Sequence, residues 1–339
     1  MTQEAPLFAI DDSVRELELR SRAEDQSSPE DWEVFDALQE FNKPQPISLN
    51  WAIYNTISIP APELNGTISI SRAVDMRKIK EREPDWNTLV VCFTDPSGNH
   101  RRLNDLDLPV DKIDNWEDPR VGANGKLGLT AVSHDGGEYY PHPALVEVGI
   151  KDGNLKVVGE PKIFKNLTGK NVIPLENGFI YRPDGISHQL HYLDHQGKLL
   201  KIIDFSNFRN IEWLSKKMGA TARPIELEDG LKLLLIHGIR EGMGIDGKPK
   251  NDIYAIGIAV LDETWHVKAV DNKPLLVRRD FLGNLQLNED LHPEKEAVYL
   301  CHFKKGIYGL TLPVNVGDRI TVFTPISDRQ LRARIKNLL

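Results

Sequence analysis

The chain has 339 residues, of which 40% are hydrophobic and 27% charged, and its formal net charge is −8. This composition is typical of a soluble globular protein and excludes the disordered and fibrous classes. The acidic balance disfavours nucleic acid and anionic membranes as main partners, because both attract clustered Lys and Arg. A small or uncharged substrate fits this balance better.

The N-terminal segment carries helical patterns and no export signal. Residues 1–26 are acidic and lack the basic start and apolar run of a secretory signal, and no window of the chain holds about 18 uninterrupted apolar residues. We therefore expect a cytoplasmic protein. Two amphipathic stretches within 11–41 predict a helical extension over 1–45. Whether it packs on its own domain or on a second copy in a homo-oligomer stays open.

Strand patterns dominate the rest of the chain. Short alternating or β-branched runs such as TLVVCFT and LKLLLIHG are separated by Gly, Asn and Asp turn signals at intervals of roughly 8–14 residues. This spacing predicts a large antiparallel β domain over 46–325. The last segment, ISDRQLRARIKNLL, has apolar residues at helical spacing and predicts a C-terminal helix over 326–339 that packs on this domain.

Five similar turns each precede a strand, which indicates a repeat. Their glycines are 59, 53, 52 and 76 residues apart, close to the roughly 40–50 residues of a four-stranded propeller blade plus its loops. The sequence therefore predicts an all-β fold, a five-bladed β-propeller with short terminal helices. The alternative, a β-sandwich with a second small domain, predicts no such period. The turns are Asn65-Gly66, Asn124-Gly125, Asn177-Gly178, Asp229-Gly230 and Lys305-Gly306.

The most distinctive local string is NWEDPR at 115–120, just before the second turn. Side chains alternate along a strand, so we expect one of the carboxylates of Glu117 and Asp118 to face a site and the other to face away. Arg120 should share the face of Asp118 and hold that carboxylate ionised or oriented. An acidic surface turn closed by a proline is the alternative.

Further polar residues recur at corresponding places in the other repeats. Each alone has an ordinary explanation as a solvated or buried structural residue. The inner strands of a propeller surround a central channel, however, so recurrence at one level places these side chains around a single axis. That arrangement suits a small polar ligand. The residues are Arg72, Lys170 with Asn171, Arg182, His237 and Asp318.

Several other kinds of site are disfavoured by the sequence. It contains no serine nucleophile elbow, Walker loop or dinucleotide fingerprint. His188, His191 and His195 are close in sequence, but strand alternation puts His188 on the face opposite the other two, so we predict no metal site. Cys92 and Cys301 lie in apolar runs and are interpreted as buried free thiols.

Together these motifs resemble glycoside hydrolase family 130, which comprises β-mannoside phosphorylases and mannosidases on a five-bladed β-propeller. The resemblance runs from about residue 50 to the C-terminus. The string Glu117-Asp118-Pro119-Arg120 is similar to the family's catalytic motif, which implies that Asp118 is the general acid. The resemblance also implies substrate binding by Asn55, Arg72, Arg120 and Asp318, and phosphate binding by Lys170, Arg182 and His237.

The resemblance implies inverting phosphorolysis of a small carbohydrate substrate, a β-mannoside, to mannose 1-phosphate. Inorganic phosphate is then a co-substrate, and no cofactor is needed. Phosphate is already an anionic nucleophile and requires cations beside it, whereas hydrolysis requires a carboxylate that activates water. No acid stands at the position of Lys170 or of His237, which favours phosphorolysis.

Two departures from the family pattern bear on this reaction. The stretch after the motif contains His134 and His142 where the family's phosphorylases carry further basic or amide residues. In addition, Ala222-Arg223-Pro224 replaces a smaller, proline-rich sequence. An altered phosphate pocket keeps two alternatives open, an inverting β-mannosidase of the same fold and a non-catalytic sugar-binding propeller.

Overall fold

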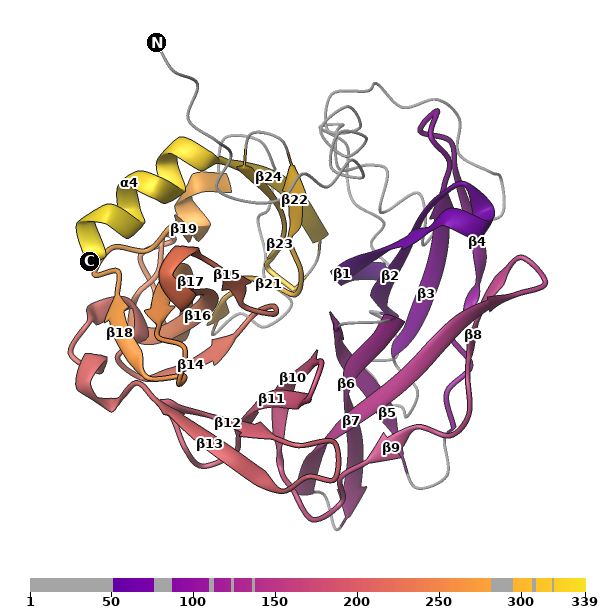
Figure 1. Ribbon diagram of the computed structural model, residues 1–339, viewed down its shortest axis with the longest axis horizontal. Coiled ribbons are helices and arrows are strands. Elements are labelled where there is room, and N and C mark those ends of the chain that lie inside the picture. Colours follow the sequence, from indigo (N-terminus) through magenta and orange to yellow (C-terminus); the bar gives the residue numbers. More distant parts are fainter. Residues whose placement is uncertain are drawn as a thin grey trace.

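The computed structural model describes residues 51–75, 87–109, 113–122, 125–135, 138–281, 295–306, 309–318 and 320–339. Within these residues the chain forms five sheets, whose strands pair almost entirely in antiparallel fashion (Figure 1). The helical extension predicted over 1–45 and Asn124 of the second turn lie outside the described residues.

The first three sheets are meanders in which successive strands pair in chain order, except that β9 of the second sheet pairs with β7. The first contains β1 (Trp51–Ala61), β2 (Gly66–Asp75), β3 (Asn87–Thr94) and β4 (His100–Asp105). The second contains β5 (Asn115–Val121), β6 (Lys126–Asp135), β7 (Glu138–Lys151), β8 (Asn154–Val157) and β9 (Lys162–Ile163). The third contains β10 (Gly169–Leu175), β11 (Gly178–Pro183), β12 (Gln189–Leu193) and β13 (Leu199–Asp204).

In the fourth and fifth sheets the first strand is split in two. Both β14 (Lys217–Ala220) and β15 (Ile225–Glu226) pair with β16 (Lys232–Met243), which is followed by β17 (Pro249–Leu261), β18 (Val267–Val270), β19 (Leu276–Val277) and β20 (Lys295–Glu296). Likewise β21 (Val298–Leu300) and β22 (Lys304–Gly306) pair with β23 (Gly309–Val316), which pairs with β24 (Ile320–Ser327). Short 3-10 helices lie at Pro62–Leu64, Ser206–Phe208, Glu212–Leu214, Glu228–Gly230 and Arg278–Phe281.

The five sheets surround a common axis (Figure 1). Their first strands meet around it, since β1 contacts β5, β5 contacts β10 and β10 contacts β14. The ring is completed by contacts of β17 with β21 and of β1 with β23 and β24. This is a five-bladed β-propeller, so the fold predicted from the turn repeat is confirmed.

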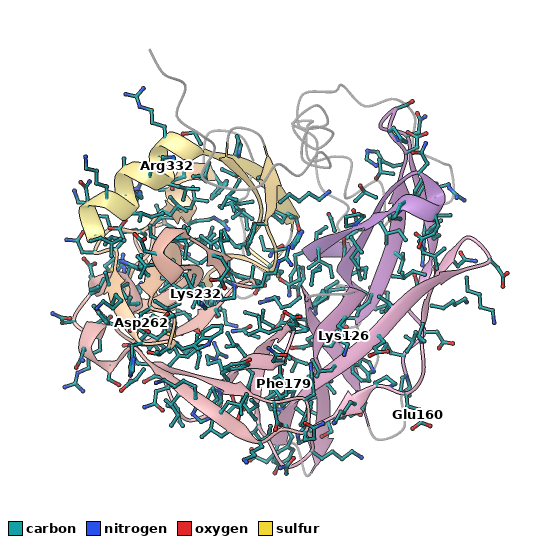
Figure 2. The ribbon with its side chains drawn as sticks, in the orientation of Figure 1. Lys126, Glu160, Phe179, Lys232, Asp262 and Arg332 are labelled. Atoms are coloured by element: carbon teal, nitrogen blue, oxygen red, sulfur yellow. The ribbon has the colours of Figure 1, made fainter. Side chains whose placement is uncertain are left out.

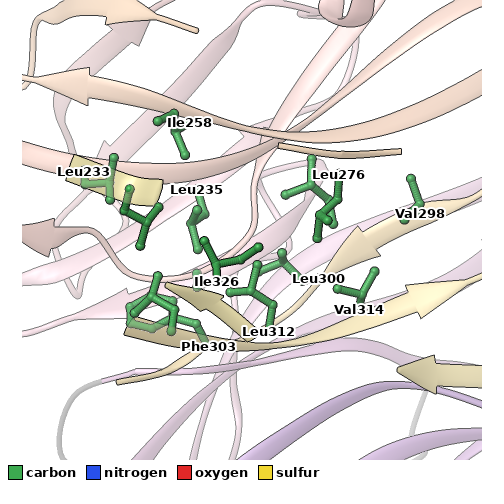
Figure 3. Packing of buried hydrophobic residues seen from close by; sticks show 14 of the residues in the cluster. Leu233, Leu235, Ile258, Leu276, Val298, Leu300, Phe303, Leu312, Val314 and Ile326 are labelled. Carbon is green, nitrogen blue, oxygen red and sulfur yellow. The ribbon is translucent and has the colours of Figure 1, made fainter. Parts of the chain in front are cut away.

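Apolar layers between neighbouring sheets hold the propeller together. Between the fourth and fifth sheets, Leu235 and Ile258 pack against Leu312 and Val314 (Figure 3). Phe179, labelled in Figure 2, lies in the layer between the second and third sheets. Burying one such side chain stabilises the fold by about 1.5–3 kcal/mol, so these layers fix how the sheets face the axis.

The chain ends in helix α4 (Asp328–Leu338), which covers the apolar layer between the fourth and fifth sheets. It begins at a capping box, in which the Ser327 hydroxyl accepts from the backbone N–H of Gln330 and the Gln330 side chain accepts from the backbone N–H of Ser327. Leu331 and Ile335 are buried against the sheets. The segment that was expected to be helical therefore packs through its apolar face.

Candidate active site

The innermost strands of the first three sheets each carry a β-bulge at the same level. In β1, β5 and β10 two consecutive residues oppose a single residue of the second strand. A bulge re-aims side chains, and its first extra residue here adopts a left-handed conformation, which Asn and Asp tolerate better than other residues with a side chain. These residues are Asn55 (φ 55°), Asp118 (φ 53°) and Asn171 (φ 60°).

The bulge in β5 brings both carboxylates of the EDPR string to one guanidinium. Arg72 places one nitrogen 2.7 Å from Oε1 of Glu117 and another 3.8 Å from Oδ1 of Asp118. The expectation that one carboxylate faces away was wrong, because the left-handed Asp118 interrupts the alternation on which that expectation rested.

Glu117 is the more deeply buried of the two carboxylates, with 3% of its surface exposed. Its second oxygen lies 3.1 Å from Nζ of Lys170 and accepts a hydrogen bond of 3.0 Å from the Tyr139 hydroxyl. Burial by itself would raise the pKa of Glu117, but the positive charges of Arg72 and Lys170 and the two hydrogen bonds outweigh it and lower the pKa to about 2. Glu117 is therefore an ionised anchor for two cations.

Asp118 is the more accessible carboxylate, with 14% of its side chain exposed against 5% for Glu117. Its Oδ1 accepts a hydrogen bond of 2.7 Å from Nδ2 of Asn55. In the part of the chain that the structure describes, its Oδ2 has no partner. An oriented carboxyl with one free oxygen is suited to exchange a proton with a ligand.

Arg120 does not contact Asp118 as the sequence predicted. Its guanidinium donates to Oδ1 of Asn171 at 3.2 Å and to the carbonyl of Pro119 at 3.1 Å, and only 1% of the residue is exposed. The prediction was wrong because the bulge changes the two-residue spacing that would have put Arg120 and Asp118 on one face. Arg120 instead links the second blade to the third.

Asp318 lies beside a group of tyrosines that sequence reasoning missed. Its Oδ1 accepts a hydrogen bond of 2.5 Å from the Tyr299 hydroxyl. The ring of Tyr254 lies 5.7 Å from that of Tyr299 and is stacked 6.0 Å from that of His237. Burial, and then the negative charge of Asp318, raise the pKa of both tyrosines. These phenols stay neutral and form a wall between Asp318 and His237.

A second group of basic residues lies on the third and fourth sheets. A Cβ on Gly219 would come within 2.5 Å of Asn171 and 2.6 Å of the His237 ring, so the missing side chain lets these two residues approach each other. Lys217 lies on the same face of β14 two residues earlier. Burial, and then the charges of Arg182, Arg120 and Lys217, lower the pKa of His237 well below its usual value.

Lys217 could not be found from the sequence, because a lone Lys in a short strand has no motif around it. The pKa of Lys217 is lowered, chiefly by burial; the negative charge of Asp252 opposes this effect and the positive charge of Arg182 adds to it. Among the described residues, Arg182 has no ion pair, and Nδ1 of His237 is buried without a hydrogen-bond partner. Uncompensated positive charge beside a free imidazole nitrogen can receive an anion.

Burial of neutral His237 predicts a pH-dependent stability. The unfolded histidine titrates near pH 6.5, whereas the folded one resists protonation. The unfolded chain therefore takes up the extra proton, and the free energy of unfolding falls as the pH drops below about 6.5. In His237→Gln this contribution is absent, so urea unfolding between pH 7 and 5 should show a shallower pH dependence than in the native chain. Equal slopes would contradict a neutral buried His237.

Other residues that the sequence singled out are buried or bonded to the main chain. Cys92 and Cys301 are buried free thiols, as interpreted. His188 contacts the carbonyl of Leu214 at 2.8 Å through Nε2. Over the described ranges, no group of three potential metal ligands forms and no helix is long and apolar enough to span a membrane.

The chain is similar to known proteins in structure and not in sequence. No family model and no curated protein matches the chain. A β-1,2-mannobiose phosphorylase from Listeria innocua superposes with a TM-score of 0.57 at 13% identity, covering 86% of this chain and 95% of that one. A mannose phosphorylase from Leishmania mexicana, solved with a phosphate ion, gives 0.52 at 16% identity, covering 84% and 86%. The chain has the fold of mannoside phosphorylases.

Solved proteins with this fold are named for different activities. A GDP-mannose-dependent mannosyltransferase from Leishmania mexicana also superposes, with a TM-score of 0.52 at 15% identity, covering 81% of this chain and 87% of that one. The fold is therefore common to proteins named for phosphorolysis and for transfer. The activity of this chain has to be argued from its own site residues.

Proposed function

We propose that this protein is a glycoside phosphorylase that cleaves β-mannosides by inverting phosphorolysis and releases mannose 1-phosphate. The observation that carries the proposal is the pairing of an oriented acid with a cationic pocket. Asp118 is held by Asn55 and Arg72, while the positive charges of Arg182 and Lys217 act on the neighbouring His237. The similar mannose phosphorylase solved with a phosphate ion supports a phosphate co-substrate.

The proposed reaction assigns one proton path and one nucleophile. Protonated Asp118 supplies a proton, through a hydroxyl of the bound mannose, to the glycosidic oxygen as its bond to the anomeric carbon breaks. Hydrogen phosphate attacks that carbon from the opposite face and forms the new C–O bond, which inverts the configuration. The proton that hydrogen phosphate loses balances the one that Asp118 gave up. Arg72 anchors the acid, and no cofactor takes part.

Hydrolysis would require a base that activates water on the face opposite Asp118. Glu117 is the neighbouring carboxylate, but it is ionised, buried and engaged by Arg72, Lys170 and Tyr139. A carboxylate with its charge neutralised in this way is a poor base. This engagement favours phosphate as the nucleophile.

Phosphate binding tests the pocket without requiring turnover. Removing one charge-assisted hydrogen bond of about 1.5–3 kcal/mol should weaken phosphate binding by about 10- to 100-fold, so calorimetric titration of Arg182→Gln and Lys217→Gln should show this loss. Lys216→Gln is the matched control, because Lys216 is adjacent in sequence but pairs with Glu241 and Asp252 at 3.0 Å each. Equal phosphate affinity in all three variants and the native chain would refute the pocket.

A further inference from the structure

The first and fifth sheets meet through buried polar groups close to the acid. The Thr56 hydroxyl is 2.9 Å from the hydroxyls of both Ser71 and Thr321. Asn55 and Asn315 are completely buried beside them. Between the other neighbouring sheets, by contrast, the described contacts include large apolar clusters. A buried polar network is costly unless it is satisfied, and when satisfied it fixes the orientation of its members.

Asn315 is the centre of this network. Its Oδ1 accepts a hydrogen bond of 2.6 Å from the backbone N–H of Asn55 and another of 2.9 Å from the Thr321 hydroxyl. The β1 bulge leaves the two extra residues, Asn55 and Thr56, opposite a single partner residue in the ladder. Asn315, from the opposite end of the chain, therefore supports the left-handed backbone at Asn55.

A directed chain of hydrogen bonds leads from Asn315 to the acid. Nδ2 of Asn315 donates to Sγ of Cys301 at 3.4 Å, and the Cys301 thiol donates to Oδ1 of Asn55 at 3.2 Å. Nδ2 of Asn55 then donates to Asp118 at 2.7 Å. Burial raises the pKa of Cys301 to about 12, so the thiol keeps its proton at neutral pH. Turning the Asn55 amide over would set its oxygen against the Asp118 carboxylate and leave the thiol without an acceptor.

We propose that Asn315 and Cys301 are positioning residues that orient the Asn55 amide so that its N–H group holds Asp118. This inference rests on the proposed function for the role of Asp118 as the acid. Neither residue touches the reacting atoms. They act through Asn55. Their replacement is therefore expected to disturb the orientation of Asp118 and not the binding of the sugar ring.

Three variants test the chain of hydrogen bonds kinetically. Cys301→Ala removes the donor to Asn55 and should lower kcat by about 10- to 100-fold, the scale of a displaced catalytic group, with little change in KM for the glycoside. Cys301→Ser keeps a donor and should recover most of the loss. Cys92→Ala is the control, because it removes the other buried thiol and should leave kcat unchanged. Equal kcat in Cys301→Ala and the native chain would overturn the proposal.

A spectroscopic readout separates this inference from the proposed function. In protein labelled with ¹⁵N at asparagine, the Asn55 side-chain NH₂ signals are assigned by their loss in Asn55→Asp. They should exchange slowly with solvent in the native chain, Cys301→Ser and Cys92→Ala, and faster in Cys301→Ala and Asn315→Ala. If no glycoside is turned over, the proposed function fails while this measurement still decides the inference. Unchanged exchange in Cys301→Ala would overturn it.

Discussion

Replacing Asp118 by Asn is expected to lower kcat by about 10²- to 10⁴-fold, the usual contribution of a general acid. The amide has the shape of the carboxyl and its oxygen can still accept from Nδ2 of Asn55, which lies 2.7 Å from Oδ1 of Asp118. It has no acidic proton to give, so the loss should appear in kcat while KM for the glycoside changes little. Initial rates over a range of glycoside and phosphate concentrations measure both constants.

The control for this substitution is Asp105→Asn at the end of β4. Its side chain is 44% exposed and is paired with Arg102 on the surface. It should retain native kcat and KM, which shows that loss of one carboxylate elsewhere has no effect. If Asp118→Asn kept native turnover as well, the assignment of Asp118 as the acid would be wrong.

Glu117→Gln is expected to lower the free energy of unfolding by about 3–5 kcal/mol, the cost of leaving buried charges without their partner. The substitution preserves volume but removes the negative charge that lies 2.7 Å from Arg72 and 3.1 Å from Lys170. Two cations would then face each other beside Asp118. Urea unfolding at pH 7, with the slope of each transition compared between variants, measures the loss.

The matched control is Glu147→Gln, which removes one partner of a surface ion pair. Glu147 lies 3.3 Å from Nζ of Lys126, labelled in Figure 2, and 60% of its side chain is exposed. Such a pair contributes about 0–1 kcal/mol, so this variant should be nearly as stable as the native chain. A Glu117→Gln variant that unfolds at the same urea concentration as Glu147→Gln would show that Glu117 is no anchor.

The propeller could be predicted because turn-forming residues recur along the sequence once in each sheet. Asn65-Gly66 and Asn177-Gly178 lead directly into β2 and β11, and Asp229-Gly230 ends a 3-10 helix just before β16. At each place Asn, Asp and Gly allow the backbone to turn. These signals depend on neighbours in sequence and need no knowledge of the tertiary fold.

The geometry of the candidate site could not be predicted in the same way, because it depends on bulges. Alternation assigned opposite faces to Glu117 and Asp118 and one face to Asp118 and Arg120, and both assignments failed where the strand contains an extra residue. The left-handed Asn or Asp is the signal that marks each bulge, but these residues are also common in turns. The contact of Asn55 with Asn315 joins residues 260 positions apart, which no local pattern records.

The most direct test of the proposed activity is the product formed from β-mannosides with and without inorganic phosphate, followed by ³¹P and ¹H NMR. We expect α-mannose 1-phosphate, formed only when phosphate is present and lost in Asp118→Asn. Release of free mannose at the same rate without phosphate would contradict phosphorolysis and establish a hydrolase. Formation of neither product from any β-mannoside would contradict an enzyme of this class and favour a sugar-binding propeller.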